Sequence, residues 1–406
     1  MIFSVFLNFY THSLPGLPSL ITVFDLLFLP IAFTYIIKIF PKIGIDQKHF
    51  SIQLHLILLL LLIMITSLPV YIYFNSKLSL KNLEDFATLL YSLFIFSVYS
   101  SYFNGDPNRI RKAFIFWYLG AVLAGVFSLI TIFGLAPSHW RLGVRISGSF
   151  KAINQLQSFV APALIISTFY LIESRKFLHR FIHILSIFLL VIALLATGSR
   201  SSIINILIAI IFANHIMTLR FPKISANFLI FLLFEIFVII NLIYLIVSIL
   251  NGSQIQIFDL DLTNIFRIVD KMQEVVDGGD LGPRGEQWAY VANNFAYYPL
   301  GIGHGNFQAV VGLKNEVHNT FLGILIENGW IVFLGFAFLY LIFPISALTI
   351  IKKDRKIALF LIYVHLEMVA YQMTVYGFRQ RIFWIELALI YSAILFLKWK
   401  DNAKVV

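Results

Sequence analysis

Residues 113–133 read AFIFWYLGAVLAGVFSLITIF, a continuous stretch without a single charged side chain. A helix needs about 20 apolar residues to cross a hydrocarbon core roughly 30 Å thick, and this stretch is long enough. Similar runs occupy most of the chain, among them Ile52–Tyr73, Phe181–Ala196, Phe228–Leu250 and Ile331–Ile351. The sequence therefore predicts a polytopic integral membrane protein built from α-helices.

Composition supports the same class for the whole chain. Of its 406 residues, 60% are hydrophobic, 16% aromatic and only 12% charged, which excludes a soluble globular domain. The chain has no cysteine, so disulfides, iron–sulfur clusters and thiol catalysis are excluded as well.

Hydropathy predicts about eleven spans, centred near residues 29, 62, 93, 123, 165, 189, 210, 238, 335, 367 and 390. A half-helix at Met1–Tyr10 would make twelve. We predict an all-α transmembrane bundle of about 11–12 spans with one large external loop that carries short helices. The expected division is N-terminal transmembrane helices over 1–250, the loop over 251–317 and C-terminal transmembrane helices over 318–406, in one integrated membrane domain.

The placement of lysine and arginine predicts the orientation. Basic residues recur in alternate connections, as in Lys38, Lys42 and Lys48, then Arg109, Arg111 and Lys112, and later Lys352, Lys353, Arg355 and Lys356. By the positive-inside rule this side is cytoplasmic, so the large loop is external. The net charge of +10 is then mostly topogenic, and it gives no support to nucleic-acid binding.

A polar, glycine-rich segment, Gly282–Gly329, interrupts the hydrophobic chain on the external side. Arginines on this side are not needed for topology, and they stand at or near predicted helix ends: Arg141 and Arg145 in HWRLGVRISGSFKAINQ, Arg200 in TGSRSS, Arg284 in GPRGEQW, and Arg379 and Arg381 in YGFRQR. Guanidinium groups there suit a phosphate or pyrophosphate. The alternative is interfacial contact with lipid headgroups, which we favour for Arg379 and Arg381; both readings stay open for Arg200 and Arg284.

Two histidines lie in the same segment. His318, in EVHNTF, stands where the loop meets the next span, so partial burial would keep its imidazole neutral and able to accept a proton. Asn319 or Thr320 would cap the helix that begins there. The alternative for His318 is a structural hydrogen bond. His304, in GIGHGNF, lies between glycines on a turn that we expect to be flexible, which makes it the weaker candidate.

The succession RISGSFKAINQ, TGSRSS, R..W with YYPLGIGHGNF, and EVHNTFLGILIENG resembles the bacterial O-antigen ligase and O-antigen polymerase superfamily. The resemblance covers roughly Trp140 to Leu339, and its most specific part is PLGIGHGNF with HNTFL..L.E.G. The first motif departs from the common form, because Ile153 rather than proline precedes Asn154.

This resemblance implies a metal-independent glycosyltransferase of the bacterial inner membrane, with its active site facing the periplasm and no nucleotide or other cofactor. Its donor would be a glycan linked to a polyprenyl diphosphate. Its acceptor would be a sugar hydroxyl on lipid A-core or on another lipid-linked repeat. The resemblance assigns the diphosphate to Arg200 and Arg284 and the acceptor hydroxyl to His318. We further expect substrate contacts at Arg145, Asn154, Gln155, Trp288, His304 and Asn319.

Other readings remain open at this stage. Trp288, Tyr290, Tyr297 and Tyr298 would either stack on sugars or pack a helix against the membrane. Ligase and polymerase chemistry are not separated. A lipid-linked oligosaccharide flippase is the alternative from another class, but the acidic residues of the spans look scattered: Asp25, Glu235, Glu367 and Glu386. A scaffold without catalysis would tolerate substitution of Arg284 and His318.

Overall fold

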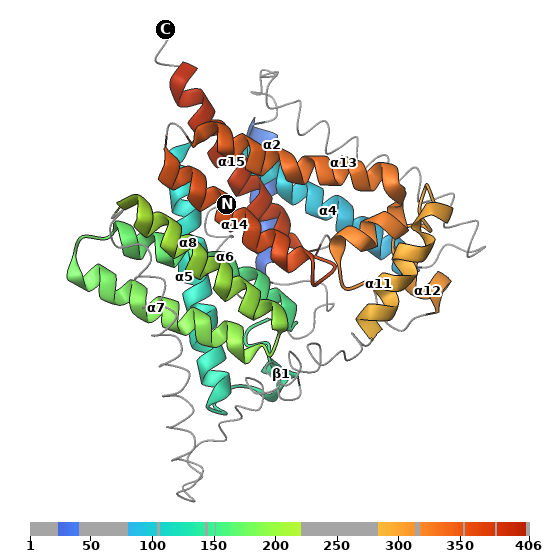
Figure 1. Ribbon diagram of the computed structural model, residues 1–406, viewed down its shortest axis with the longest axis horizontal. Coiled ribbons are helices and arrows are strands. Elements are labelled where there is room, and N and C mark those ends of the chain that lie inside the picture. Colours follow the sequence, from blue (N-terminus) through green and yellow to red (C-terminus); the bar gives the residue numbers. More distant parts are fainter. Residues whose placement is uncertain are drawn as a thin grey trace, which may run out of the picture.

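The computed structural model describes residues 23–39, 80–103, 106–142, 145–150, 152–220, 283–312, 317–351, 354–377 and 380–402. These residues form helices α2 (Val23–Ile39), α4 (Leu80–Phe103), α5 (Pro107–Ile132), α6 (Ile153–Glu173), α7 (Phe177–Ala196), α8 (Arg200–Arg220), α11 (Pro283–Asn294), α12 (Phe307–Val311), α13 (Thr320–Ile350), α14 (Arg355–Gln372) and α15 (Arg381–Asn402) (Figure 1). The described residues also form two 3-10 turns, η2 (Ser138–Trp140) and η3 (Phe295–Tyr297). A short hairpin pairs β1 (Arg141–Leu142) with β2 (Arg145–Ile146). The predicted all-α polytopic fold is confirmed.

Five described helices are long and apolar enough to cross a membrane: α5, α6, α7, most of α8, and α13. Every predicted span centre that falls on a described residue lies within a helix. The centres near 62 and 238 and the half-helix at Met1–Tyr10 lie outside the described residues. The short helices predicted for the large loop are present as α11, η3 and α12, which pack beside the start of α13 (Figure 1).

Contacts between distant parts of the sequence show which helix ends lie together. The Lys356 ammonium donates to Glu173 Oε1 at 2.8 Å, which joins the start of α14 to the end of α6. The Thr320 hydroxyl donates to the Val375 carbonyl at 2.7 Å, which joins the start of α13 to the chain just after α14. We call the end of the bundle that carries Thr320 the loop end, and the opposite end, with Lys356, the lysine end.

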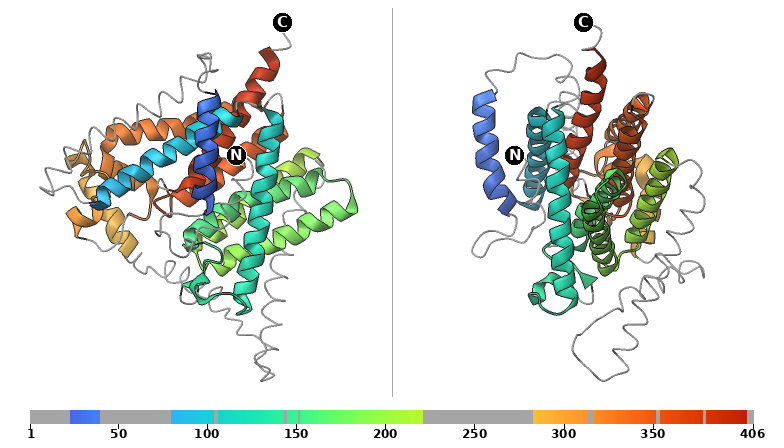
Figure 2. Two further views of the ribbon diagram at one scale, coloured as in Figure 1. Left: turned by 180° about the vertical axis from the view of Figure 1, so that it is seen from behind. Right: turned by 90° about the vertical axis from the view of Figure 1, so that its left-hand side faces the viewer.

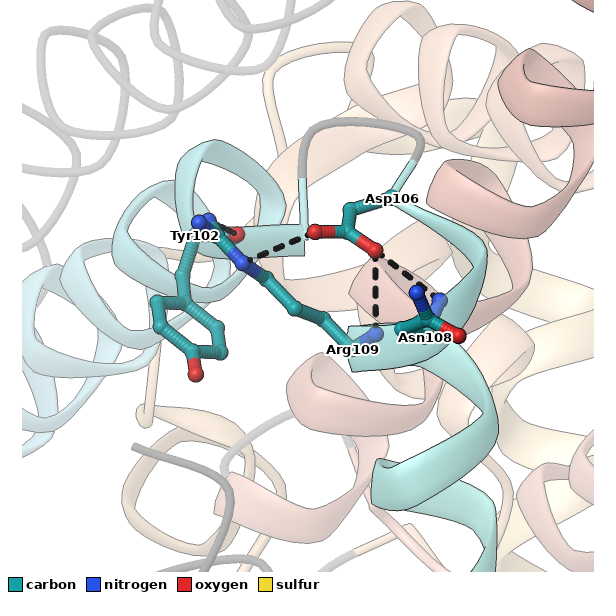
Figure 3. Close-up of polar contacts among 4 residues, drawn as sticks. All are labelled: Tyr102, Asp106, Asn108 and Arg109. Carbon is teal, nitrogen blue, oxygen red and sulfur yellow. Dashed lines mark hydrogen bonds and ion pairs between the residues drawn. The ribbon is translucent and has the colours of Figure 1, made fainter.

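The turn from α4 to α5 at the lysine end is closed by its own side chains (Figure 3). Asp106 caps α5, since its Oδ1 accepts from the backbone N–H groups of Asn108 at 2.9 Å and Arg109 at 3.2 Å. Arg109 Nε lies 3.1 Å from Asp106 Oδ2, and its Nη1 donates to the Tyr102 carbonyl at 2.7 Å. The polar groups of this turn thus satisfy one another.

Helices α5, α6 and α7 pack closely because α5 presents small residues. An added Cβ at Gly125 would lie 3.3 Å from the Leu189 carbonyl oxygen of α7. Trp117 stacks on Phe159 of α6, with ring centroids 5.5 Å apart, and its indole N–H donates to the Phe159 carbonyl at 2.9 Å. Small residues at helix crossings allow such approach in membranes, where apolar surface alone gives little drive to associate.

Helix α2 lies at one edge of the molecule, beside α4 (Figure 2, right). Phe28 stacks on Tyr99 of α4 at a centroid distance of 5.6 Å. The buried carboxylate of Asp25 accepts from the Tyr91 hydroxyl at 2.6 Å and forms an ion pair with Arg381 at the start of α15. For Arg381, which we expected to contact lipid headgroups, the structure therefore provides a carboxylate partner within the protein.

Candidate functional site

Predicted site residues gather in two places at the loop end. The first corner comprises residues 145–150, 152–157 and 197–205, from β2 to the starts of α6 and α8. The second corner comprises residues 283–312 and 317–329 with 372–377. Helix α14 joins them, because its Glu367 contacts Asn205 of the first corner while its Gln372 side chain contacts the Thr320 hydroxyl of the second.

In the first corner, TGSRSS is the reversal between α7 and α8. Thr197 ends α7, and Gly198, at φ 60°, takes the left-handed conformation that commonly follows a helix. Helix α8 then begins at Arg200. The Thr197 hydroxyl lies 2.9 Å from that of Ser202, and the Ser199 hydroxyl 2.7 Å from that of Ser201. These bonds fix the turn so that Arg200 stands at the amino-terminal end of α8.

The two arginines of the hairpin bind helix carboxyl ends. Arg141 Nη2 donates to the Thr131 carbonyl at 2.7 Å, at the end of α5. Arg145 Nε donates to the Thr197 carbonyl at 2.7 Å, at the end of α7. A cation is favourable there, because the last carbonyls of a helix lack intrahelical donors. Arg145 is thereby held beside the turn that carries Arg200, while Asn154 and Gln155 lie half-buried in the first turn of α6.

Behind the turn lies a buried polar network that sequence reasoning missed. Gln157 Nε2 donates to the Ser201 hydroxyl at 2.7 Å. With its amide oriented to match its neighbours, Asn205 donates to Glu367 Oε2 at 3.2 Å and accepts from Gln157 Nε2 at 3.1 Å. The available signal was the spacing of Ser201 and Asn205, which places two polar residues on one face of an apolar helix.

In the second corner, the turn GIGHG binds to a break in α13. Gly329 has φ 81° and ψ 168°, so the helix is interrupted there. The carbonyls of Ile326 and Glu327 accept instead from the N–H groups of Ile302 and Gly303, both at 2.9 Å. The approach is so close that an added Cβ at Gly301, or at Gly329, would lie 2.2 Å from a backbone oxygen. Gly301 and Gly329 therefore make this backbone contact possible.

His304 is completely buried beneath this contact. Its Nδ1 lies 3.7 Å from Glu327 Oε2, which also accepts from the Tyr376 hydroxyl at 3.0 Å. The turn that we expected to be flexible is therefore packed against α13 and against the chain after α14. A contact between His304 and substrate stays a prediction, and its burial favours a supporting role.

His318 stands half-buried at the entrance to α13. Its backbone N–H donates to Gln287 Oε1 at 3.3 Å, and Gln287 lies one turn after Arg284 on α11. Asn319 is the N-cap of α13, since its side chain accepts from the Leu322 N–H at 3.1 Å. The predicted helix cap is thus confirmed for Asn319, and Thr320 instead links α13 to α14.

Most of the aromatic residues in the described part of the loop pack inside it. Trp288, Tyr290 and Tyr298 lie against a small core formed by Val291, Ile302, Phe307, Val317 and Ile326. Burial, and then the neighbouring Tyr298, raise the pKa of the Tyr290 phenol above its usual value, so the group is neutral at physiological pH. Only Tyr297, 78% exposed, is turned fully outward among these four. Of these four residues, Tyr297 is therefore the most accessible for stacking on a sugar or packing against the membrane.

The three residues assigned to catalysis share one structural feature. Arg200 is the first residue of α8, Arg284 the second residue of α11, and His318 precedes the N-cap of α13. The backbone N–H groups at a helix start are unpaired and carry partial positive charge, which favours anions such as phosphate. Anion binding by Arg200 and Arg284 at these positions stays a prediction. Arg379 lies outside the described residues.

One sequence expectation is wrong. The acidic residues of the spans are not scattered, because Glu367 of α14 and Glu386 of α15 line the same small cavity, together with Ser158, Pro162 and Tyr371. Asp25, by contrast, is paired with Arg381, and Glu235 lies outside the described residues.

Comparison with known proteins identifies one family. Residues 185–337 match the family model described as O-Antigen ligase. The match runs from within α7 to within α13, so it includes Arg200, Arg284, Trp288, His304, His318 and Asn319 but not the hairpin or α6. No curated protein matches the chain.

Proposed function

We propose, from the premise that the chain belongs to the O-antigen ligase and polymerase superfamily of membrane glycosyltransferases, that it transfers a glycan from a polyprenyl-diphosphate carrier to a sugar hydroxyl during surface polysaccharide synthesis. The acceptor is lipid A-core or the end of another lipid-linked repeat. The loop end faces the periplasm, the lysine end faces the cytoplasm, and the protein resides in the inner membrane, as the positive-inside rule favours.

The observation that carries this proposal is the placement of Arg200, Arg284 and His318 at the starts of α8, α11 and α13. Breaking the bond between the anomeric carbon and the diphosphate leaves additional negative charge on the carrier. Arginines at helix starts stabilise that charge more in the transition state than in the ground state, which lowers the barrier. The leaving group then needs no metal ion or nucleotide.

His318 is the base in this scheme. As the acceptor hydroxyl attacks the anomeric carbon, its proton passes to the imidazole, the new glycosidic bond forms, and the bond to the carrier diphosphate breaks. The hydrogen bond from the His318 backbone to Gln287 supports this role, because it ties the base to the helix that carries Arg284. A positioned general base contributes about 10²- to 10⁴-fold to rate.

The experiment is complementation of a host lacking the gene with wild type, Arg284→Ala, Arg284→Lys or the control Arg355→Ala, followed by electrophoresis of the surface polysaccharide. Arg355 is an exposed arginine at the lysine end. We expect Arg284→Ala to lose long chains, Arg284→Lys to restore them in part because it keeps charge without the planar fork, and Arg355→Ala to match wild type, all at equal protein levels. Wild-type polysaccharide from Arg284→Ala would refute the assignment.

The same gel separates the two acceptors. Loss of all long chains from lipid A-core, with polymer accumulating on the carrier, indicates a ligase. A single repeat that remains attached to lipid A-core indicates a polymerase. A flippase predicts instead that purified protein with donor and acceptor forms no new glycosidic bond.

A further inference from the structure

A small cavity lies between α6, α14 and α15, just inside the loop end. Glu367 stands one and a half turns before the end of α14, and Glu386 one and a half turns after the start of α15. Both carboxyl groups therefore lie at a similar depth, roughly 7–8 Å from the helix ends at 1.5 Å per residue. The cavity has room for about one water molecule.

The two carboxyl groups that line this cavity are almost completely inaccessible to solvent, at 0% for Glu367 and 3% for Glu386. Glu367 Oε2 accepts from Asn205, but among the described residues no hydrogen-bond partner reaches Oε1 of either glutamate. An ionised carboxylate buried in a membrane protein is very unfavourable unless a positive charge or hydrogen bonds compensate it. At the edge of the bundle Arg381 compensates Asp25, whereas no basic side chain lines this cavity.

Further oxygen atoms are available at the same place. Pro162 has no N–H, so the Ser158 carbonyl one turn earlier in α6 lacks its helical donor, and both residues line the cavity. The Tyr371 hydroxyl donates its proton to Gln380 Oε1 at 2.5 Å and is also hydrogen-bonded to the Ser158 side chain, which leaves one oxygen lone pair for a further contact. Two carboxyl groups, a carbonyl and a hydroxyl supply the oxygen ligands that hard cations prefer, beside the Gln372 amide that also lines the cavity. Broken helices supply such carbonyls to Na⁺ in membrane proteins.

Protonation is the alternative to an ion, because a carboxyl O–H could donate to the Ser158 carbonyl or to the other carboxyl group, and the test below separates the two. We propose that the cavity binds one dehydrated Na⁺ ion, held by Glu367, Glu386, the Ser158 carbonyl and the Tyr371 hydroxyl. The ion balances one carboxylate, and a proton on the other makes the site neutral. The size of the cavity favours Na⁺ over the larger K⁺, and Mg²⁺ is disfavoured because it retains several waters.

Glu367 also links this ion to the first corner. Its other oxygen holds Asn205, and the Asn205 amide donates to the carbonyl of Ser201, the residue after Arg200. Occupancy of the cavity therefore stabilises the start of α8. This positioning effect on Arg200 rests on the proposed function, whereas the binding of Na⁺ does not.

The test is binding of radioactive ²²Na⁺ to the purified full-length protein, together with its unfolding temperature in NaCl, KCl or choline chloride at constant ionic strength and pH. A ligand that binds only the folded state raises the unfolding temperature with its concentration. We expect saturable binding of one Na⁺ per chain, weak competition by K⁺, and an unfolding temperature several degrees higher in NaCl than in choline chloride.

Substitutions of the two cavity glutamates test where the ion binds. Glu386→Gln and Glu367→Gln preserve side-chain size, and we expect both to lose ²²Na⁺ binding and the NaCl effect. The matched control is Glu173→Gln, which changes an exposed carboxylate at the lysine end and should behave as wild type. If a cavity variant fails to fold, the binding of ²²Na⁺ to the wild-type protein still tests whether the protein binds Na⁺.

Three results would overturn the proposal. If the wild-type protein binds no ²²Na⁺, the site does not exist. If both cavity variants still bind ²²Na⁺, the ion binds elsewhere in the protein. In the third result, the unfolding temperature does not change with Na⁺ but changes with pH, and Glu386→Gln removes the pH dependence. The cavity would then hold two protonated glutamates and a water molecule in place of an ion. Each of these results leaves the transfer reaction untouched, so it is distinguishable from a failure of the proposed function.

Discussion

In the first corner the TGSRSS turn is held by side chains, whereas in the second corner the GIGHG turn is held by its backbone. Gln157, Ser201 and Asn205 bond to one another beneath Arg200. Ile302 and Gly303 instead donate backbone N–H groups into the break of α13. The difference implies that the first corner depends on the polar identity of its residues, while the second depends on the absence of Cβ atoms.

Substitution of a glycine at the second contact should have the largest effect on stability. In Gly329→Ala or Gly301→Ala the new methyl group would lie 2.2 Å from a backbone oxygen, at a φ of 81° or 80°. Strain at such a φ costs about 1–3 kcal/mol by itself, and the clash adds to it. We expect either variant to lose more than about 3 kcal/mol of unfolding free energy, measured by thermal unfolding of purified protein.

Gly312→Ala is the matched control for these variants. Gly312 has φ 73°, but apart from its chain neighbours no described residue lies within 4 Å of its added Cβ. The unfolding free energy of Gly312→Ala should therefore fall only by the cost of an alanine in the left-handed conformation, about 1–2 kcal/mol. Equal losses in Gly312→Ala and Gly329→Ala would contradict the close backbone contact.

Loss of a polar partner should disturb the first corner next. Gln157→Leu keeps similar volume but leaves Ser201 and Asn205 with fewer partners in a buried site, which should cost about 1–3 kcal/mol. The unfolding temperature should fall accordingly. A Gln157→Leu protein as stable as wild type would mean that the network contributes nothing to the corner.

Removal of one hydroxyl from the second corner should have a smaller effect than its glycine substitutions. Tyr376→Phe deletes the hydrogen bond to Glu327 Oε2, and the expected loss is about 1 kcal/mol. Tyr297→Phe changes a largely exposed tyrosine and should leave stability unchanged. If Tyr376→Phe destabilised the protein as much as Gly329→Ala, side chains rather than backbone would dominate this corner.

The smallest effect is expected at the lysine end, far from both corners. Asp354 caps α14 by accepting from the Ile357 N–H at 3.1 Å. Asp354→Ala should lower the unfolding free energy by about 1 kcal/mol, while Asp354→Asn retains a capping oxygen and should lose little. Transfer activity should be unchanged in both, and a specific loss of activity would place a functional group at this end.

Local patterns in the sequence were sufficient to predict the helices. The apolar run at 113–133 predicts a span because its length alone matches a membrane, and α5 covers nearly all of it. Contacts across the bundle were not predictable in this way. Glu367 and Glu386 meet because α14 and α15 turn those faces toward α6, and hydropathy does not encode the rotation of one helix against another.

The candidate site shows the same distinction between local patterns, which the sequence reveals, and contacts across the bundle, which it does not. Its residues were chosen from motifs, and the structure places three of them at helix starts as the local capping signals suggest. The burial of His304 was not foreseen, because it depends on the break at Gly329 in α13, which lies beyond α12 in the sequence. Likewise, the bond from Arg145 to the Thr197 carbonyl joins two motifs that are separated by a whole helical hairpin.

The central claim is that His318 accepts the proton of the acceptor hydroxyl while arginines hold the diphosphate. The most direct measurement is single-turnover transfer from a labelled lipid-diphosphate donor by purified wild type, His318→Ala and the control His179→Ala, an exposed histidine of α7. Donor affinity is measured in parallel. The account predicts that His318→Ala binds donor as wild type does but transfers about 10²- to 10⁴-fold more slowly, with His179→Ala unchanged. An undiminished transfer rate in His318→Ala would contradict it.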